Sequence, residues 1–192
     1  MKNDKIFIWL IHCPRTGGTS IKDYCLDLDK KGMARFERTA HRRYSDAEKA
    51  KMIKKYGKIV SITTVRDPIT HSESLFSYIR SDRSNKEFRL AKSGFVQWIS
   101  KPSNHNYLMR FWGGSLDEAE RNLKQIDHVL QMESLKRSFN RILASIGLPK
   151  SFNLFRHKGD VTKYTLNEKE KDLVRKFREK DYELLERLGF KY

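Results

Sequence analysis

The sequence has few cysteines. Its 192 residues include two, Cys13 and Cys25, which are too few for a disulfide framework. Their spacing matches none of the usual metal-ligand patterns. Because both have apolar neighbours, we expect them to be buried free thiols in a protein of a reducing compartment.

Long hydrophobic runs are also lacking. The longest, Ile6–Ile11, is far shorter than the roughly 18 residues that cross a bilayer. It is also too short for the core of a signal peptide, and a polar Gly-rich turn follows it instead of a cleavage site. We therefore expect a cytoplasmic protein, and a domain cut from a Golgi-lumen protein is the alternative.

Acidic residues are outnumbered by basic ones. Forty Lys and Arg against 24 Asp and Glu give a net charge of +16, which attracts anions without choosing among nucleic acid, acidic polysaccharide, lipid and a phosphorylated cofactor. The 11 Phe, 8 Tyr and 3 Trp are enough to build a core, so disorder is excluded as the main state. With four prolines, no repeat and no linker, residues 1–192 are predicted to form a single domain.

Strand-like and helix-like hydrophobic patterns alternate along the chain. Near-continuous apolar or β-branched runs predict strands over residues 6–13, 59–65 and 126–132. Apolar residues three and four positions apart, or a proline in the first turn, predict helices over 21–28, 68–80, 135–146 and 173–188. This alternation predicts an α/β fold, a three-layer P-loop-like sandwich with a central parallel sheet of about four to five strands.

Two capping-box patterns mark the starts of helices. Ser45 and Glu48 precede a helix that should end at a glycine and bury three residues, Ala50, Ile53 and Tyr56. Thr165 and Glu168 give the same pattern before the last helix. The polar and basic stretch 81–92 is expected to be a loop.

The turn between the first strand and the first helix has the chemistry of a phosphate site. It lies where a doubly wound sheet binds anions, and its glycines let backbone N–H groups approach a phosphate. No Lys precedes Thr19, so the magnesium–triphosphate pattern GxxxxGK[ST] is absent, which favours a single 5′-phosphate carrying one transferable group. An ordinary capped turn is the alternative. The residues predicted to hold this group are Arg15, Gly17, Gly18, Thr19 and Ser20, and the family resemblance described below adds Thr16.

A second polar cluster follows the second predicted strand. Arg66 stands where this strand ends, and Ser74 lies about two helical turns further on, so both can face one pocket. An arginine and a hydroxyl that converge on an anion form a second phosphate site, and a surface pair of Arg66 with Asp67 is the alternative. Two phosphate sites without a magnesium motif indicate a nucleotide that is phosphorylated at two separate positions.

Together these segments resemble the sulfotransferase superfamily that uses 3′-phosphoadenosine 5′-phosphosulfate (PAPS). Residues 11–21 resemble its 5′-phosphosulfate loop, residues 64–78 its 3′-phosphate motif, and residues 126–148 a further family segment. The similarity is to carbohydrate sulfotransferases of the heparan-sulfate 2-O-sulfotransferase type and their bacterial relatives. The resemblance implies in-line transfer of a sulfuryl group from PAPS to a hydroxyl, expected on a carbohydrate, without a required metal.

The resemblance also implies the role of each basic residue. Arg15 would neutralise the departing bisphosphate oxygen, and Arg66 with Ser74 would hold the 3′-phosphate. Arg156 and Lys158 would cover that phosphate, because their turn resembles the family's Arg-Lys-Gly loop, and a solvated charge run is the alternative.

The sequence departs from the family pattern at two places. Arg15 replaces the usual lysine, which keeps the charge on a planar group that does not lose its proton. Thr70 and His71 replace a frequent Asp-Arg pair, so the role of that pair is not carried over to them.

Transfer to a hydroxyl needs a general base, for which histidine and carboxylates are the usual choices. His41 lies in a polar loop four residues before Ser45, and the catalytic histidine of short bacterial relatives precedes a helix in the same way. We therefore expect His41 to be the base. Glu37 is the competitor, because other branches of the superfamily use a glutamate soon after the first loop. The remaining histidines are expected to be structural or solvent-exposed, with His71 near Ser74.

The expected partner is an anionic carbohydrate, with no specific nucleic acid and no membrane insertion. A basic rim suited to such an acceptor would be formed by Arg35, Arg38, Arg42, Arg43 and the Arg80–Arg89 loop. Two other functions stay open. A P-loop kinase or nucleotidase using ATP is opposed by the missing GK[ST] motif, and a basic nucleic-acid-binding protein has no recognisable motif in its favour.

Overall fold

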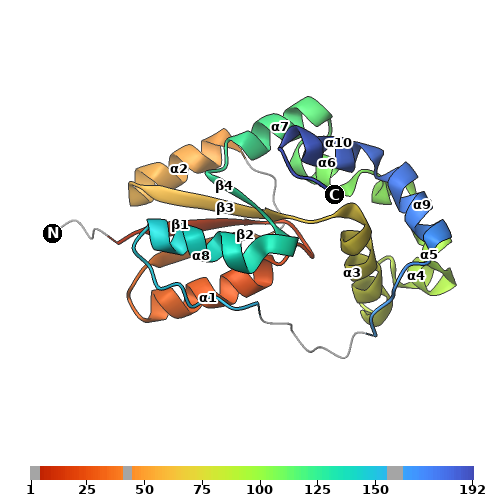
Figure 1. Cartoon of the computed structure of the whole chain (residues 1–192), viewed down its shortest axis with the longest axis horizontal. Coiled ribbons are helices and arrows are strands. Elements are labelled where there is room, and N and C mark those ends of the chain that lie inside the picture. Colours follow the sequence, from red (N-terminus) through yellow and green to blue (C-terminus); the bar gives the residue numbers. More distant parts are fainter. Residues whose placement is uncertain (1–4, 41–44, 155–161) are drawn as a thin grey trace. The chain divides into compact units, whose positions relative to one another are not determined.

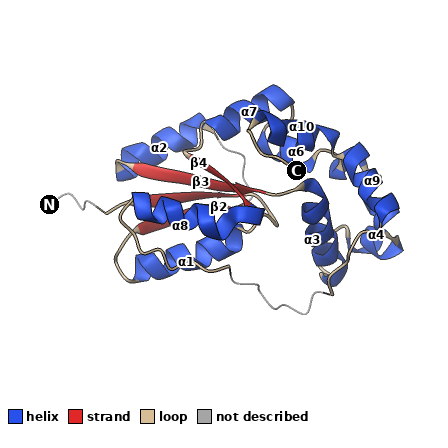
Figure 2. Cartoon of the chain, in the orientation of Figure 1, coloured by secondary structure: helices blue, strands red, loops and turns tan. Residues whose placement is uncertain are grey.

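The computed structural model describes residues 5–40, 45–154 and 162–192, which form two compact units (Figure 1). The first, here called the sheet unit, comprises residues 1–65 and 121–156. The second, the helical unit, comprises residues 66–120 and 157–192. Figure 2 shows that the strands of the described chain all belong to the sheet unit.

The sheet has four parallel strands in the order β2-β1-β3-β4, which confirms the predicted α/β fold with a central parallel sheet. Its strands are β1 (Phe7–His12), β2 (Arg35–Ala40), β3 (Ile59–Val65) and β4 (His128–Gln131). Every residue of β1 is buried, as expected for the inner strand of a parallel sheet that is covered on both faces.

Helices cover both faces of this sheet, which makes the sheet unit three-layered (Figure 1). On one face, α1 (Gly18–Lys30) and α8 (Leu135–Ser145) share a core with Ile8 and Leu10 of β1. On the other face, α2 (Asp46–Tyr56) places the ring of Tyr56 against Phe7, with 3.8 Å between the ring centroids. Alternate residues of β1 therefore enter two separate layers.

Strand β2 was not predicted, because its sequence RFERTA was interpreted as part of a polar loop. The structure pairs it with β1 in register from Phe7↔Arg35 to His12↔Ala40. Its charged residues suit its position at the edge of the sheet, where charge discourages pairing with another chain. The same strand is tied to β1 by a 2.7 Å hydrogen bond from Trp9 Nε1 to Thr39 Oγ1.

The start of α2 was predicted correctly, but its buried face was not. The hydroxyl of Ser45 accepts a hydrogen bond from the Glu48 backbone N–H, and Gly57 ends the helix. Met52 is the buried residue of α2, whereas Ala50 and Ile53 are exposed and Tyr56 is half-buried. The prediction that Ala50 and Ile53 are buried was therefore wrong, because Met52, one residue before Ile53, faces the sheet.

The helical unit surrounds a core rich in aromatic side chains. Its long helix α3 (Pro68–Ser81) packs against the short helices α4 (Phe88–Ser93) and α5 (Phe95–Ile99) and against α9 (Glu168–Phe177). Buried side chains such as Phe76 and Trp98 fill the centre. The remaining elements are α6 (Tyr107–Trp112), α7 (Leu116–Lys124), α10 (Glu179–Arg187) and the 3-10 turns Pro102–Asn104 and, in the sheet unit, Met132–Ser134.

Two expectations about this unit were wrong. Residues 88–93 form helix α4, although the stretch 81–92 was predicted to be a loop. The last helix is two helices, because α9 ends at Phe177 and α10 begins at Glu179. The capping box of α9 is made by Asn167 and Glu170, two residues after the predicted pair.

The expectation for the two cysteines agrees with the structure. Cys13 and Cys25 are buried free thiols, and burial raises the pKa of Cys25 to about 12. Within the described part of the chain, no helix is both long enough and apolar enough to cross a membrane.

Candidate anion-binding site

The loop after β1 leads directly into the first helix and holds unusual backbone conformations. Arg15 has a φ of 63° and Gly17 a φ of 92°, both in the left-handed region. Gly17 occupies the N-cap position of α1, so the N-cap residue of this helix has no side chain with which to cap it. The N-terminal backbone N–H groups of α1 thus have the arrangement in which helices bind phosphate or sulfate.

A side chain at either of the two central positions of this loop would require neighbouring side chains to move. A Cβ on Gly17 would overlap the sulfur of Met132 and a methyl group of Leu135, which follow β4. A Cβ on Gly18 would overlap the imidazole of His12. The loop backbone therefore packs directly against neighbouring side chains, and this close packing depends on the absence of side chains at Gly17 and Gly18.

Thr16 holds the loop to the sheet. Its buried hydroxyl lies 2.7 Å from the Cys13 carbonyl and 2.7 Å from the Thr64 hydroxyl of β3. Since the Thr16 hydroxyl has one proton, which it donates to Cys13, it accepts from Thr64. Thr16 was predicted to bind a cofactor, and with its hydroxyl occupied it can offer its backbone N–H.

The remaining side chains of the loop differ in exposure. Arg15 and Thr19 are half-buried, so each keeps part of its surface in contact with solvent. Ser20 is buried, with 5% of its surface exposed, and its N–H donates to the Gly17 carbonyl at 3.1 Å. The loop therefore offers a solvent-borne anion one guanidinium, one hydroxyl and backbone donors.

The carboxylate of Asp127 holds β4, the strand that precedes Met132, in place. Asp127 Oδ2 accepts from the Ser61 N–H at 2.8 Å and from the Ser61 hydroxyl at 2.7 Å, and Lys49 lies 3.6 Å from Asp127 Oδ1. Burial alone raises the pKa of Asp127, but the hydrogen bonds from Ser61 and the charge of Lys49 outweigh burial and hold this pKa below its usual value. The ionised carboxylate thus keeps β4 against β3.

In the helical unit, Arg66 directly follows β3 and is oriented by helix α3. Its Nε donates a 3.1 Å hydrogen bond to the hydroxyl of Thr70. Asp67 caps α3 by accepting from the Thr70 N–H at 2.8 Å, so Thr70 itself has a fixed position. Thr70 was not predicted to have a role, because the family resemblance has another residue there. Its spacing of four from Arg66 was the available signal.

Ser74 lies one helical turn beyond Thr70 on the same face of α3 and is half-buried. Neighbouring positions on this face of α3 anchor the start of the C-terminal segment. Ser77 Oγ accepts from the Tyr164 N–H at 2.9 Å, and Glu73 Oε1 accepts from the Leu166 N–H at 3.0 Å. Arg156 and Lys158, which were predicted to cover a phosphate, lie outside the described residues.

The two candidate bases have different outcomes. His41 lies outside the described residues. Glu37 is in the middle of β2, opposite Trp9, where it accepts from the Tyr56 hydroxyl at 3.1 Å and lies 3.9 Å from Lys55 Nζ. Three residues separate Glu37 from the end of β2, or about 10 Å along the strand. The structure therefore does not bring Glu37 to the loop.

Of the other predicted polar residues, Arg35 also lies away from the loop. Arg35 pairs with Phe7 where the strands begin, whereas the loop follows the end of β1. Arg35 therefore cannot contribute to a basic rim around the loop. His71 is fully buried in the helical unit, 5.0 Å from the ring of Tyr107, which favours a structural role. Among the described residues, no cluster of His, Cys, Asp and Glu is arranged to hold a metal ion.

Comparison with known proteins gives an informative match among solved structures. No family model and no curated protein matches this sequence. The chain is similar to the crystal structure of a sulfotransferase from Alicyclobacillus acidocaldarius, with a TM-score of 0.56 and 14% identity over 94% of both chains. The fold is that of a sulfotransferase. At this identity the likeness concerns the path of the backbone, and the roles of single residues rest on the geometry given above.

Proposed function

We propose that this protein is a PAPS-dependent sulfotransferase that acts on a hydroxyl group, with a carbohydrate as the expected acceptor. The observation that carries the proposal is the start of α1, where the N-cap residue is Gly17, which has no side chain and whose left-handed conformation turns the chain beside Arg15. This arrangement provides backbone donors and one cation for an anion, in a chain with the sulfotransferase fold.

The groups of the loop fit the 5′ end of the donor. PAPS would supply the sulfuryl group: a bond forms between the acceptor oxygen and sulfur while the bond from sulfur to the 5′-phosphate oxygen breaks. Negative charge grows on that phosphate oxygen, and Arg15 with the N-terminal N–H groups of α1 would stabilise it. The left-handed conformation of Gly17 lets these donors converge without an intervening side chain.

The 3′-phosphate is assigned to the helical unit. Arg66, oriented by Thr70, would donate to that phosphate together with Ser74 on the same face of α3. Arg156 and Lys158 remain proposed as covering residues, which the anchoring of Tyr164 and Leu166 to α3 supports.

His41 is proposed as the general base that takes the proton of the acceptor hydroxyl. In support, β2 ends at Ala40 in register with His12, so the backbone reaches the edge of the sheet where the loop begins. Glu37 is the weaker candidate, because Tyr56 and Lys55 already bind its carboxylate.

Calorimetric titration of the full chain with 3′-phosphoadenosine 5′-phosphate tests the nucleotide site. Binding should be unchanged by EDTA and should weaken at least about tenfold in Arg15→Ala and in Arg66→Ala, since each loses a charge-assisted hydrogen bond. Arg141→Ala, an exposed change on α8, is the matched control and should bind like the wild type. Binding of ATP with magnesium in preference to the bisphosphate would instead support a kinase.

Transfer of ³⁵S from labelled PAPS to a panel of carbohydrates tests the reaction and the base. His41→Ala should retain affinity for the bisphosphate and lose transfer, whereas Glu37→Gln should retain both. Loss of transfer in Glu37→Gln alone would give the role of base to Glu37. Absence of transfer to every hydroxyl acceptor, together with tight salt-sensitive binding of nucleic acid, would favour a nucleic-acid-binding protein.

A further inference from the structure

The sheet unit contains a basic cavity at the edge opposite to the anion-binding loop. The cavity has a volume of about 840 Å³ and lies where β1, β2 and β3 begin, as the pairing of Phe7 with Arg35 and Ile59 shows. Since β1 has six residues, the cavity is about 20 Å from the loop at the other end of that strand. We call it the amino-edge pocket.

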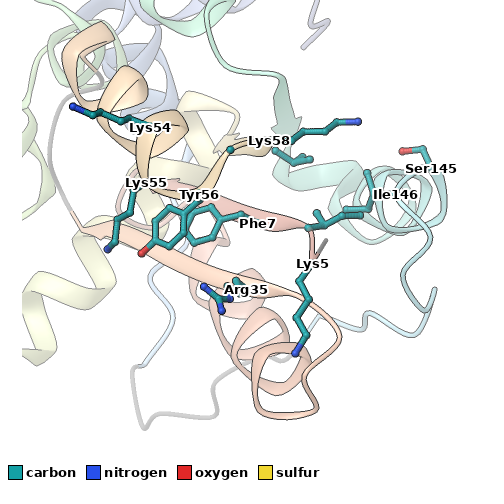
Figure 3. Close-up of a pocket in the computed structure, with 12 residues that line it drawn as sticks. Lys5, Phe7, Arg35, Lys54, Lys55, Tyr56, Lys58, Ser145 and Ile146 are labelled. Atoms are coloured by element: carbon teal, nitrogen blue, oxygen red, sulfur yellow. The ribbon is translucent and has the colours of Figure 1, made fainter. Parts of the chain in front are cut away.

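Five cations line this pocket, and none of its lining residues is acidic. They come from three separate segments of the chain, and the set is Lys5, Arg35, Lys54, Lys55 and Lys58. Figure 3 shows several of these side chains around the rings of Phe7 and Tyr56. Among the described residues, the one carboxylate near them is Glu37, 3.9 Å from Lys55 Nζ. The charges of the other four have no ion-pair partner in the described part of the chain.

Helix ends explain only part of this charge. The last turn of α2 contains Lys54 and Lys55, and lysines there offset the partial negative charge of a helix C-terminus. Lys5, Arg35 and Lys58 lie outside the helices, so this effect does not account for them. Cations that gather around a recess without counter-charge repel one another, and a bound anion removes that repulsion.

The aromatic residues of the pocket restrict what kind of anion fits. Phe7 stacks on one face of the Tyr56 ring at 3.8 Å, and Lys55 Nζ lies 4.5 Å from the centroid of the same ring. Phe7 itself is 2% exposed. Phe7 therefore cannot stack on a nucleobase, and at most one face of Tyr56 is left for the base stacking that is usual in single-stranded nucleic-acid sites.

We infer that the amino-edge pocket is a second anion site, which takes a compact, multiply sulfated or phosphorylated sugar and no nucleotide. Its volume is in the range of small-molecule sites and suits about a disaccharide. The site is independent of the proposed transfer reaction, because its residues and those of the loop lie at opposite edges of the sheet.

Titration with sucrose octasulfate, a densely charged disaccharide, tests this inference on the full chain. The experiment is done with the loop saturated by 3′-phosphoadenosine 5′-phosphate and repeated in Arg15→Ala, so that failure of the loop site leaves the result readable. We expect one octasulfate per chain, no binding of uncharged sucrose, and weaker binding at higher salt.

A triple variant identifies the pocket. Lys5→Gln, Arg35→Gln and Lys58→Gln together should weaken octasulfate binding at least tenfold, keep affinity for the bisphosphate, and leave thermal stability unchanged or higher. The matched control removes the same charge from exposed positions of the helical unit, through Lys169→Gln, Lys180→Gln and Lys191→Gln, and should change affinity less than twofold. Equal weakening in both variants, or no binding by the wild type, would overturn the inference. Tighter binding of single-stranded dT12 through the same three cations would also overturn it.

Discussion

The 13–18 loop and the 66–74 segment offer an anion two different kinds of group. The loop presents mainly backbone N–H groups, and its shape is set by close packing around Gly17 and Gly18. The segment presents side chains, and hydrogen bonds to Thr70 and Asp67 set their directions. Substitutions that add atoms should therefore weaken anion binding by the loop. Substitutions that remove a hydroxyl should weaken anion binding by the segment.

Gly17→Ala, a change in the loop, should have the largest effect on stability and on binding. The added methyl group meets Met132 and Leu135 at a residue whose φ is 92°, so overlap and backbone strain act together. We expect a loss of roughly 2–4 kcal/mol in the free energy of unfolding, measured by urea titration, and loss of bisphosphate binding.

Gly147→Ala separates the two causes. Gly147 also has a positive φ, of 74°, but a Cβ there would meet no atom within 4 Å. It should lose only the strain contribution, about 1–2 kcal/mol, and bind the bisphosphate normally. If both variants lost equal stability, packing against Met132 and Leu135 would not be what restricts the loop to glycine.

Asp127→Asn should have a smaller and pH-dependent effect on the support of the loop. The folded protein holds the pKa of Asp127 below its unfolded value, so this carboxylate stabilises the fold above the unfolded pKa. That contribution disappears as the pH falls through the folded pKa. We expect the variant to be about 1 kcal/mol less stable at pH 7, and the urea midpoints of the two proteins to converge as the pH is lowered from 7 to below the folded pKa of Asp127. A constant difference across this range would contradict the role of the ionised carboxylate.

Thr70→Val should have the smallest effect on stability and a selective effect on binding. The change removes the hydroxyl that accepts from Arg66 Nε but keeps the backbone bond to Asp67. Bisphosphate affinity should fall by about three- to tenfold, in line with one weakened hydrogen bond, while the unfolding midpoint hardly moves. Thr70→Ser, which retains the hydroxyl, should restore affinity. If Thr70→Ser binds as weakly as Thr70→Val, the hydroxyl does not orient Arg66.

The sequence predicts the buried parts of the fold better than its edges. Strands β1 and β3 have apolar runs that only a covered parallel sheet explains, and their bounds agree with the structure to within one residue. Strand β2 has charges at Arg35, Glu37 and Arg38, because an edge strand needs one covered face only. A polar strand of this kind has no signal that distinguishes it from a loop.

The sequence also predicts the glycine turn and the helix start of the candidate anion site, but not how the side chains within it are bonded. The glycines and the helix start were found from their order along the chain. That the Thr16 hydroxyl is occupied by Cys13 and Thr64 depends on a contact between residues 48 positions apart. Such long-range partners follow from the three-dimensional arrangement, which local spacing does not contain.

The insertion of residues 66–120 between β3 and β4 affects how the protein folds while it is being synthesised. When the ribosome has added Val65, three of the four strands and helix α1 exist, but α8, which covers the same sheet face as α1, does not. Synthesis of residues 66–145 takes roughly 4–16 s at 5–20 residues per second. During that time the apolar side chains around Val60 and Ile62 lack their final cover, and the nascent chain is open to chaperones and to aggregation.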